Sequence, residues 1–405
     1  MPDSLSAAGT TPQTDTPMPP IPPAVRAQKP VLITEGPVAG LPSHFAWPAM
    51  EQEAFEEGQG LAFLGPIGVV EVRGQDRLSW LTTLSSQVLD DLTPGISKEL
   101  LLLDQNGRIE FAAGAIDDGQ STWLLVEPQF AEGLTDFLCS MQFMLRVEVS
   151  DLSGDYVGFA RVAPAVRDTA DAPDAGGALI WTDPWPGVTP GGAVYFQGPH
   201  PGGSTRFQII AVPRDQVDAF VETWLATEGR SLVGLLAANA TRVAAWRPLV
   251  SAEVDDRTLP AELDWLRTAV HTNKGCYRGQ ESVARIINLG RPPRRLVFLQ
   301  LDGSGGEVAA EVIPGAPVEL DGRQVGVVTS VAQHYEMGPI ALALVKRNLN
   351  ADAQLKVSGV DARQELIVPV DGRSNHAPKE RPGAGLRRLD PTKHDIRTTG
   401  PGAKR

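Results

Sequence analysis

One cysteine of this chain has neighbours that suit thiol chemistry. Cys276 has a cation two residues away on each side, Lys274 before it and Arg278 after it. Positive charge favours a thiolate over a thiol, so both cations are predicted to lower the pKa of Cys276. Gly275 and Gly279 belong to the same segment and permit a tight backbone turn. The pattern predicts a reactive thiol, and its alternative is an incidental buried cysteine in a glycine-bounded turn.

Two neighbouring elements are predicted to hold this cysteine in place. Glu281 and Arg285 have the i,i+4 spacing of a helical ion pair, so a helix is expected directly after the turn. The dipeptide Asn106-Gly107 lies between two apolar runs, and this combination is a strong signal for a β-hairpin.

The remaining pattern indicates a mixed fold. Residues 68–74 are rich in β-branched side chains and predict a strand, after which Asp76 is expected to cap a helix. Beyond Arg295, short apolar runs separated by Pro-Gly and Asp-Gly turns predict a small all-β barrel. Because helices and strands mix without strict alternation, the fold class is predicted as α+β.

Composition excludes several classes of function. The chain has 405 residues and a net charge of −13, and an acidic surface is repelled by phosphate backbones, so no nucleic-acid partner is expected. Two cysteines are fewer than the four ligands that usually hold an iron–sulfur cluster, and no stably bound metal is expected. Without a signal-peptide pattern or an apolar run of membrane-spanning length, the chain is expected to be cytoplasmic and free of membrane contacts.

A longer motif around Cys276 points to a known family. The run Lys274-Gly275-Cys276-Tyr277-Arg278-Gly279-Gln280-Glu281 resembles the signature K-G-C-Y-x-G-Q-E of the YgfZ branch of the folate-binding glycine-cleavage T-protein (GcvT) superfamily. Weaker similarities follow in the same order along the chain, at Gly74-Gln75-Asp76-Arg77, at residues 102–109, at Arg242-Val243-Ala244-Ala245, at residues 259–263 and at residues 314–318. The resemblance covers roughly residues 60–347.

This resemblance implies a fold, a ligand and a role. The fold would be a three-domain GcvT-like cloverleaf around a central channel for tetrahydrofolate, with a small C-terminal β-barrel. The role would be that of a tetrahydrofolate-binding accessory protein that helps to assemble or maintain iron–sulfur enzymes through the motif cysteine. The implied functional residues are Cys276, Lys274 and Arg278 for the chemistry, and Arg242, Trp246, Tyr277, Gln280, Glu281, Arg285 and Glu110 for the folate.

Composition at the two ends and the resemblance between them give expected boundaries. These are a disordered proline-rich leader (1–43), a first folate-binding α+β domain (44–150), a second α+β domain with the cysteine motif (151–294), the C-terminal barrel (295–370) and a disordered basic tail (371–405).

Two other functions stay open at this point, namely a folate-dependent aminomethyl (C1) transferase and a scaffold that has lost folate and only docks partners. The transferring branch carries tandem aspartates where this chain has Glu110-Phe111, and a Glu where it has Ala244. A carboxylate orients the folate amines and assists proton transfer, so these replacements weigh against transfer, although Glu110 can substitute.

Other polar residues are interpreted as structural. Cys139 has an apolar helical context and is predicted to lie in the core. The acidic stretch that contains Glu253, Glu262 and Asp264 is predicted to be a solvated surface.

Overall fold

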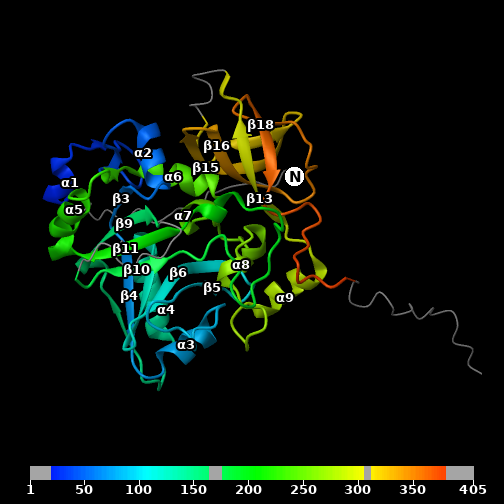
Figure 1. Ribbon diagram of the computed structural model, residues 1–405. Helices are drawn as coiled ribbons and strands as arrows, with labels where there is room; N and C mark the ends of the chain where they lie inside the picture. The colour runs from blue at the N-terminus through cyan, green and yellow to red at the C-terminus, as the bar shows by residue number, and fades with distance from the viewer. Residues whose placement is uncertain (1–19, 164–175, 305–311, 380–405) are drawn as a thin grey trace, which may run out of the picture.

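Three packed units make up the computed structural model, which describes residues 20–163, 176–304 and 312–379 (Figure 1). Two units are five-stranded sheets with helices, and the third is a closed six-stranded barrel. The α+β class and the C-terminal barrel predicted from the sequence are confirmed.

The first unit is a sheet with strand order β5-β6-β7-β4-β8, and helices α3 and α4 pack against it. Trp80 of α3 and Leu134 of α4 lie in one buried cluster with Leu102 and Leu124 of the strands. The elements are β4 (Gly68–Arg73), α3 (Arg77–Leu84), β5 (Ser97–Leu103), β6 (Ile109–Asp117), β7 (Ser121–Val126), α4 (Ala131–Ser140) and β8 (Glu148–Asp151).

The predicted hairpin joins β5 to β6, with Leu103 opposite Ile109 and Gly107 at a φ of 78° in the turn. The predicted strand at residues 68–74 is β4. The predicted cap is wrong: Asp76 makes no side-chain cap at the start of α3, because its carboxylate is taken by the guanidinium and the backbone N–H of Arg146.

The second unit is a sheet with strand order β10-β11-β9-β3-β12. Phe220 and Trp224 of α5 pack against its strands, and α2 and α6 lie against each other beside the barrel. Its elements are α2 (Pro48–Glu56), β3 (Gly60–Gly65), β9 (Tyr156–Val162), β10 (Leu179–Thr182), β11 (Phe207–Pro213), α5 (Val217–Leu225), β12 (Ser231–Val233), α6 (Leu235–Ala244), α7 (Val250–Glu253), α8 (Leu266–Ala269) and α9 (Gln280–Leu289).

The third unit closes in the order β13-β16-β15-β14-β17-β18. Its elements are β13 (Arg294–Leu301), β14 (Pro317–Leu320), β15 (Arg323–His334), β16 (Gly338–Lys346), β17 (Leu355–Val357) and β18 (Val360–Leu366). Closure pairs β13 with both β16 and β18, so the six described strands of the barrel leave no edge open for another chain.

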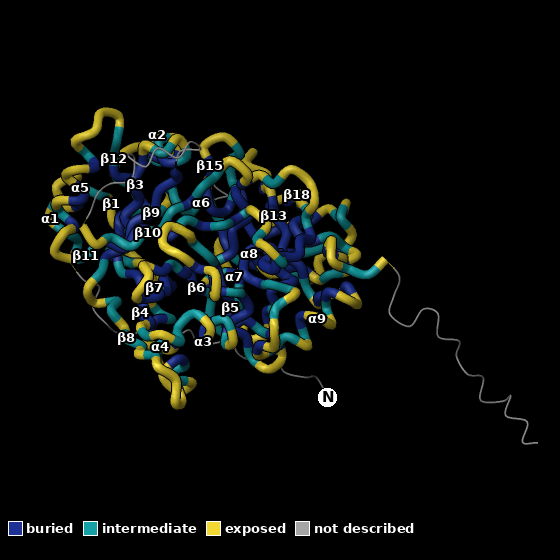
Figure 2. The backbone as a smooth tube through the Cα atoms, turned by 60° about the horizontal axis from the view of Figure 1, so that its bottom comes forward, coloured by how far each residue is buried: buried dark blue, intermediate teal, exposed yellow. Residues whose placement is uncertain are grey.

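All three units share one core where they meet. Its largest side chains are three tryptophans of the second unit, Trp185, Trp246 and Trp265. Leu101 of the first sheet and Phe298 of the barrel pack into the same cluster. The centre of the molecule is therefore filled by large apolar side chains. The backbone of the buried residues forms the dark blue inner part of the tube in Figure 2.

Two of the predicted boundaries differ from the structure. Strand β3 lies in the range assigned to the first domain, yet it pairs with β9 and β12 of the second sheet. Part of the predicted leader is folded, as α1 (Pro23–Ala27) and the paired strands β1 (Val31–Leu32) and β2 (Pro42–His44). Proline starts α1 at a position whose N–H needs no helical partner, and Val25 is fully buried.

The first residues of the predicted disordered tail are also folded. Asn375 donates its backbone N–H to the carbonyl of Val194 and accepts the N–H of Val194 on its side-chain oxygen. Residues 371–379 are thus hydrogen-bonded to the second unit through Asn375. Residues 1–19 and 380–405 lie outside the described part of the chain. Within the described ranges, no helix has the length and apolar character needed to cross a bilayer.

The start of the barrel depends on a buried ion pair. Arg294 donates to Glu262, whose side chain is 1% exposed, and to Asp255 at 2.6 Å. We expect Arg294→Met to lower the free energy of unfolding by about 3 kcal/mol, because it leaves the buried Glu262 carboxylate unpaired. The matched control is Arg257→Met, which removes an exposed arginine with longer contacts to Asp255 and Asp256. Urea denaturation measures both, and equal losses would contradict the role of Arg294.

Candidate functional site: the Cys276 loop

Cys276 lies in the loop between α8 and α9, and its side chain is exposed. The next residue, Tyr277, points the other way and is buried in the core shared by the three units. The loop is therefore fixed by an aromatic side chain while it presents the thiol to solvent. The alternative of a buried cysteine is wrong.

Lys274 attaches the loop to the first unit. Its ammonium group donates to the carbonyl oxygens of Thr82 and Ser85, at the end of α3, and to that of Gln87 at 3.1 Å. The ammonium also lies 4.9 Å from the centre of the Tyr277 ring. Burial lowers the pKa of Lys274 to about 8.

Arg278 makes a second attachment. Its guanidinium donates to the Glu110 carboxylate on β6 at 2.8 Å, and both side chains are about one-third exposed. An ion pair at this exposure contributes only ~0.2–1 kcal/mol, so it orients the loop more than it stabilises the fold. Each predicted cation thus has an oxygen partner on the first unit, and the effect of these cations on the Cys276 thiol stays a prediction.

A third attachment is a close contact of two backbones. Gly279 has a φ of 82°, and a Cβ at this position would lie 2.6 Å from the carbonyl oxygen of Asp104 and 2.7 Å from the Cα of Gly107. Only glycine fits this approach without a shift of the backbone. The Asn106-Gly107 hairpin and the cysteine motif, two separate sequence signals, therefore meet in space.

Of the other predicted motif residues, Gln280 stays near the loop. Its amide donates to the carbonyl of Lys274 at 3.4 Å. Glu281 and Arg285 lie on the exposed side of α9, whereas the buried side is formed by Val283 and Ile287. The structure therefore does not bring Glu281 and Arg285 into the central core.

Arg242 is buried and joins the second unit to the barrel. Its guanidinium donates to Ser330 of β15 at 2.7 Å, to Asn239 at 2.9 Å and to Glu253 at 3.3 Å. Glu253 in turn accepts the Ser330 hydroxyl at 2.6 Å. Arg242 thus connects α6 and α7 to strand β15 of the barrel. Its predicted contact with folate stays a prediction.

Trp246 follows α6 at a φ of 56° and is 3% exposed. Its ring lies 5.0 Å from Phe196, 5.1 Å from His200 and 6.2 Å from Phe298 of the barrel. Edge-to-face contacts of this kind favour a rigid aromatic cluster.

Several buried polar groups of this centre were missed by the sequence analysis. Arg247 forms ion pairs with Asp183, at 2.7 Å, and with Glu99 of the first sheet. Burial raises the pKa of Asp183 to about 6, against the charge of Arg247. Arg247 also lies 5.4 Å from the ring centres of Trp185 and Trp265. No local signal predicts this group, because Arg247 and Glu99 are 148 residues apart.

Four buried polar atoms around Trp185 have no hydrogen-bond partner among the described residues: Tyr195 Oη, His200 Nε2, Arg247 Nη1 and Trp265 Nε1. His200 Nδ1 accepts the N–H of Gly202 at 3.2 Å and burial lowers its pKa to about 3, so the neutral ring carries its proton on Nε2. Most of these atoms are thus donors that lack an acceptor.

These donors and rings match, in type, what a pteridine requires, namely flat apolar walls and groups that face its ring nitrogens and carbonyl. The three tryptophans are at most 3% exposed, so a ligand reaches the donors only when side chains move. The tetrahydrofolate implied by the resemblance therefore fits the chemistry of this centre but not its closed packing.

Two structural predictions are corrected by burial. Glu253, Glu262 and Asp264 are buried rather than solvated, because each is paired with an arginine: Arg242, Arg294 and Arg267 respectively. Cys139 is exposed rather than in the core, because the buried side of α4 is formed by Ala131, Leu134 and Leu138.

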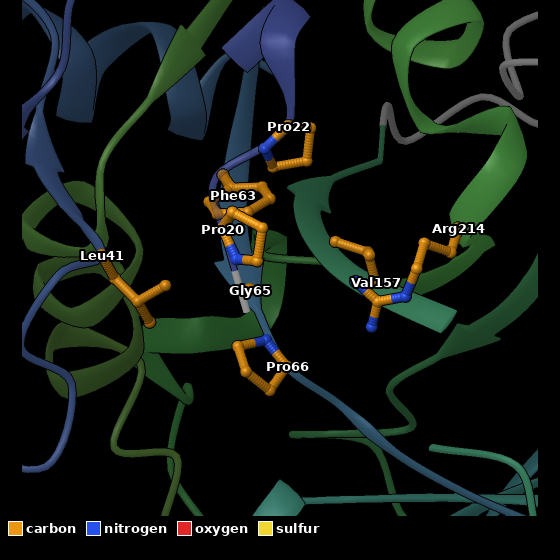
Figure 3. Close-up of a pocket in the computed structure, with 8 residues that line it drawn as sticks. All are labelled: Pro20, Pro22, Leu41, Phe63, Gly65, Pro66, Val157 and Arg214. Atoms are coloured by element: carbon orange, nitrogen blue, oxygen red, sulfur yellow. The ribbon is translucent and has the colours of Figure 1, made fainter. Parts of the chain in front are cut away.

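A small hollow lies away from all of these groups, between the N-terminal segment and the second sheet (Figure 3). Pro20, Pro22, Leu41 and Phe63 line it, and Arg214 is its charged residue. None of the predicted site residues reaches this hollow. Across the described ranges, no group of three or more His, Cys, Asp or Glu side chains is placed to hold a metal ion.

Comparison with known proteins agrees with this architecture. Residues 294–371 match the glycine cleavage T-protein C-terminal barrel domain. The crystal structure of the glycine cleavage system aminomethyltransferase T from Bartonella henselae superposes with a TM-score of 0.66 at 16% identity, covering 86% of this chain and 96% of that one. The chain therefore has a GcvT-like fold, and its C-terminal residues match the barrel domain of the glycine cleavage T-protein.

Sequence relatives of this GcvT-like chain include an aminomethyltransferase of Geobacillus kaustophilus, 29% identical over 82% of this chain and 91% of the relative. A chloroplastic Arabidopsis thaliana protein described as a transferase is 25% identical over 69% of this chain. The match spans 63% of that plant protein's length.

The contact between Gly279 and Gly107 gives a test of how the GcvT-like chain holds its cysteine loop. We expect Gly279→Ala to lower the free energy of unfolding by about 2 kcal/mol or more, since alanine disfavours this φ and its methyl group meets backbone atoms. The matched control is Gly275→Ala, because a Cβ there meets nothing within 4 Å. Thermal denaturation of both variants measures the difference, and a similar small loss in each would contradict the close contact.

Proposed function

We propose that this GcvT-like chain is a tetrahydrofolate-binding accessory protein of the YgfZ type that supports iron–sulfur enzymes through Cys276. The observation that carries the proposal is the exposed thiol on a loop with three separate attachments, at Lys274, Arg278 and Gly279. A cysteine with a structural role need not be exposed on a fixed loop, whereas a thiol that reacts with another protein must be accessible in a defined position.

The chemistry proposed for Cys276 is exchange at sulfur. Its thiolate attacks one sulfur of an oxidised cysteine pair in an iron–sulfur enzyme, a new S–S bond forms, and the second sulfur leaves as a thiolate. A dithiol reductant then attacks the Cys276 sulfur of the mixed disulfide and releases the partner's cysteine as a thiolate. The second thiol of the reductant closes the reductant's own disulfide and frees Cys276 as a thiolate, so the partner gains the two electrons that the dithiol loses. Exposure of Cys276 supports this role, because the sulfur attacked must approach in line with the thiolate.

The place proposed for tetrahydrofolate is the centre around Trp185. Tyr195, His200, Arg247 and Trp265 would donate to the ligand, and Trp246 would stack against it. Tetrahydrofolate bound at this centre would supply a carrier for one-carbon units. Tyr277 adjoins the same core, so a ligand at this centre would be connected to the Cys276 loop through one side chain.

Rescue of a deletion strain tests the proposal. We expect wild type to restore the activity of iron–sulfur enzymes in extracts and Cys276→Ser to restore at most about one-tenth of it. Cys139→Ser is the matched control, since Cys139 is equally a free, exposed cysteine. Full rescue by Cys276→Ser would show that the Cys276 thiol takes no part in the mechanism.

Aminomethyl transfer is the second candidate, and the names of the bacterial relatives favour it. Its acid would be Glu110, which the structure places at the surface in a pair with Arg278. For a transferase we expect Glu110→Ala to abolish turnover of an aminomethyl donor protein with tetrahydrofolate, and Cys276→Ser to leave it unchanged. Turnover by the wild-type chain that depends on Glu110 alone would replace the first proposal by this one.

A further inference from the structure

A group of apolar side chains projects into solvent where α4 turns back to β8. Met141 is 38% exposed, Phe143 88%, Met144 99% and Leu145 43%. We call residues 141–145 the apolar tip; it belongs to the exposed connection beside α4 and β8 at the lower edge of Figure 2. Exposure of single apolar residues is common, but four in five consecutive positions form a patch that marks an interaction site.

The backbone of the tip is strained to present these side chains. The N–H of Leu145 donates to the carbonyl of Gln142 at 3.2 Å, which places Phe143 and Met144 at the two central positions of a turn. Phe143 has a φ of 38°, a conformation that turns normally assign to Gly, Asn or Asp. Because Phe143 gains no buried contact in return, neither packing nor turn formation explains its presence here.

The motif Gly74-Gln75-Asp76-Arg77 forms the base of the tip. None of its four residues belongs to the Cys276 loop or to the place proposed for folate. Arg146 follows the tip, and its guanidinium donates to Asp76 and, at 2.6 Å, to Gln75. Gly74 permits the close approach of this strand, since a Cβ there would lie 2.0 Å from the carbonyl oxygen of Arg146. The Arg77 guanidinium donates to the carbonyl of Gly74 at 3.3 Å and to Asp117.

One helix connects the tip to the Cys276 loop. The indole N–H of Trp80, in α3, donates to the carbonyl of Met141 at 3.3 Å, and Asp76 precedes the same helix. The carbonyls of Thr82 and Ser85 at its other end hold Lys274. A helix of eight residues is about 12 Å long, so the tip and the cysteine loop lie within one docking footprint.

We propose that the apolar tip is the docking surface for the iron–sulfur enzyme that meets Cys276, inserted into an apolar hollow on that partner. This inference rests on the proposed function. The area favours such a partner over a second copy of the chain, because four side chains bury far less than the ~800 Å² per partner of a stable dimer.

Charge argues against a lipid surface as the occupant. Asp136 on α4 and Glu148 on β8 are exposed close to the tip, and the two nearby arginines have their charges paired, Arg146 with Asp76 and Arg73 with Glu71. Anionic headgroups attract basic segments and would be repelled by this surround.

Rescue of the deletion strain tests the docking surface. We expect the double variant Phe143→Ser/Met144→Ser to restore at least five-fold less iron–sulfur enzyme activity than wild type. The matched control is Trp47→Ser/Met50→Ser, which also removes two largely exposed apolar side chains, 78% and 64%, from α2 and its N-terminal flank. In a Cys139→Ser background Cys276 is the single thiol, so its rate of reaction with a disulfide reagent shows that each variant keeps the site intact. Rescue equal to wild type by the tip variant would overturn the proposal.

A photo-crosslinking residue at position 144 identifies the occupant. The expected adducts contain the same iron–sulfur enzymes whose activity falls in the deletion strain, and Phe143→Ser removes them. An adduct with twice the mass of the chain, or tip-dependent sedimentation with anionic phospholipid vesicles, would each overturn the proposal, as would the absence of any adduct. Failure of the proposed function is seen separately, as full rescue by Cys276→Ser, whatever the tip variant does.

Discussion

Buried arginines hold the three units of this chain together. Arg247 connects Asp183 of the second unit to Glu99 of the first, and Arg242 connects Glu253 of the second unit to Ser330 of the barrel. A buried charge without its partner costs several kcal/mol, so the Arg247–Glu99 pair does not tolerate a shift of one sheet against the other. Ser330 of the barrel is hydrogen-bonded to both Arg242 and Glu253. The arrangement of the units is therefore fixed by buried ion pairs and hydrogen bonds in addition to the shared apolar core.

That fixed arrangement is what gives the Cys276 loop its position. The loop belongs to the second unit, but Lys274, Arg278 and Gly279 all contact the first. If the two sheets moved apart, the three attachments would be lost together, because each is a short-range contact. The position of the thiol at the edge of the molecule thus depends on the rigid packing at its centre. Helix α3 contacts both the Cys276 loop, through Lys274, and the apolar tip, through Trp80.

The elements predicted well from the sequence are those whose signals are local. The hairpin at Asn106-Gly107, strand β4 and the all-β character of the barrel each follow from a short stretch of turn residues or β-branched side chains. What could not be predicted depends on distant partners. Strand β3 joins the second sheet through β9, almost a hundred residues later, and the acids Glu253 and Glu262 are buried because arginines from other segments neutralise them.

The closed centre and the exposed surface of this fold suit different kinds of function. One fold supports several chemistries, so the fold of the chain does not by itself decide which one it performs. Here the centre is closed by Trp185, Trp246 and Trp265, with donors that only a ligand or water could satisfy, while Cys276 and the apolar tip face outward. A transferase needs its reacting atoms at the enclosed folate, where solvent is excluded. A protein that acts on other proteins needs its reactive atom outside, next to a surface that others can recognise, and this chain exposes both the Cys276 thiol and the apolar tip.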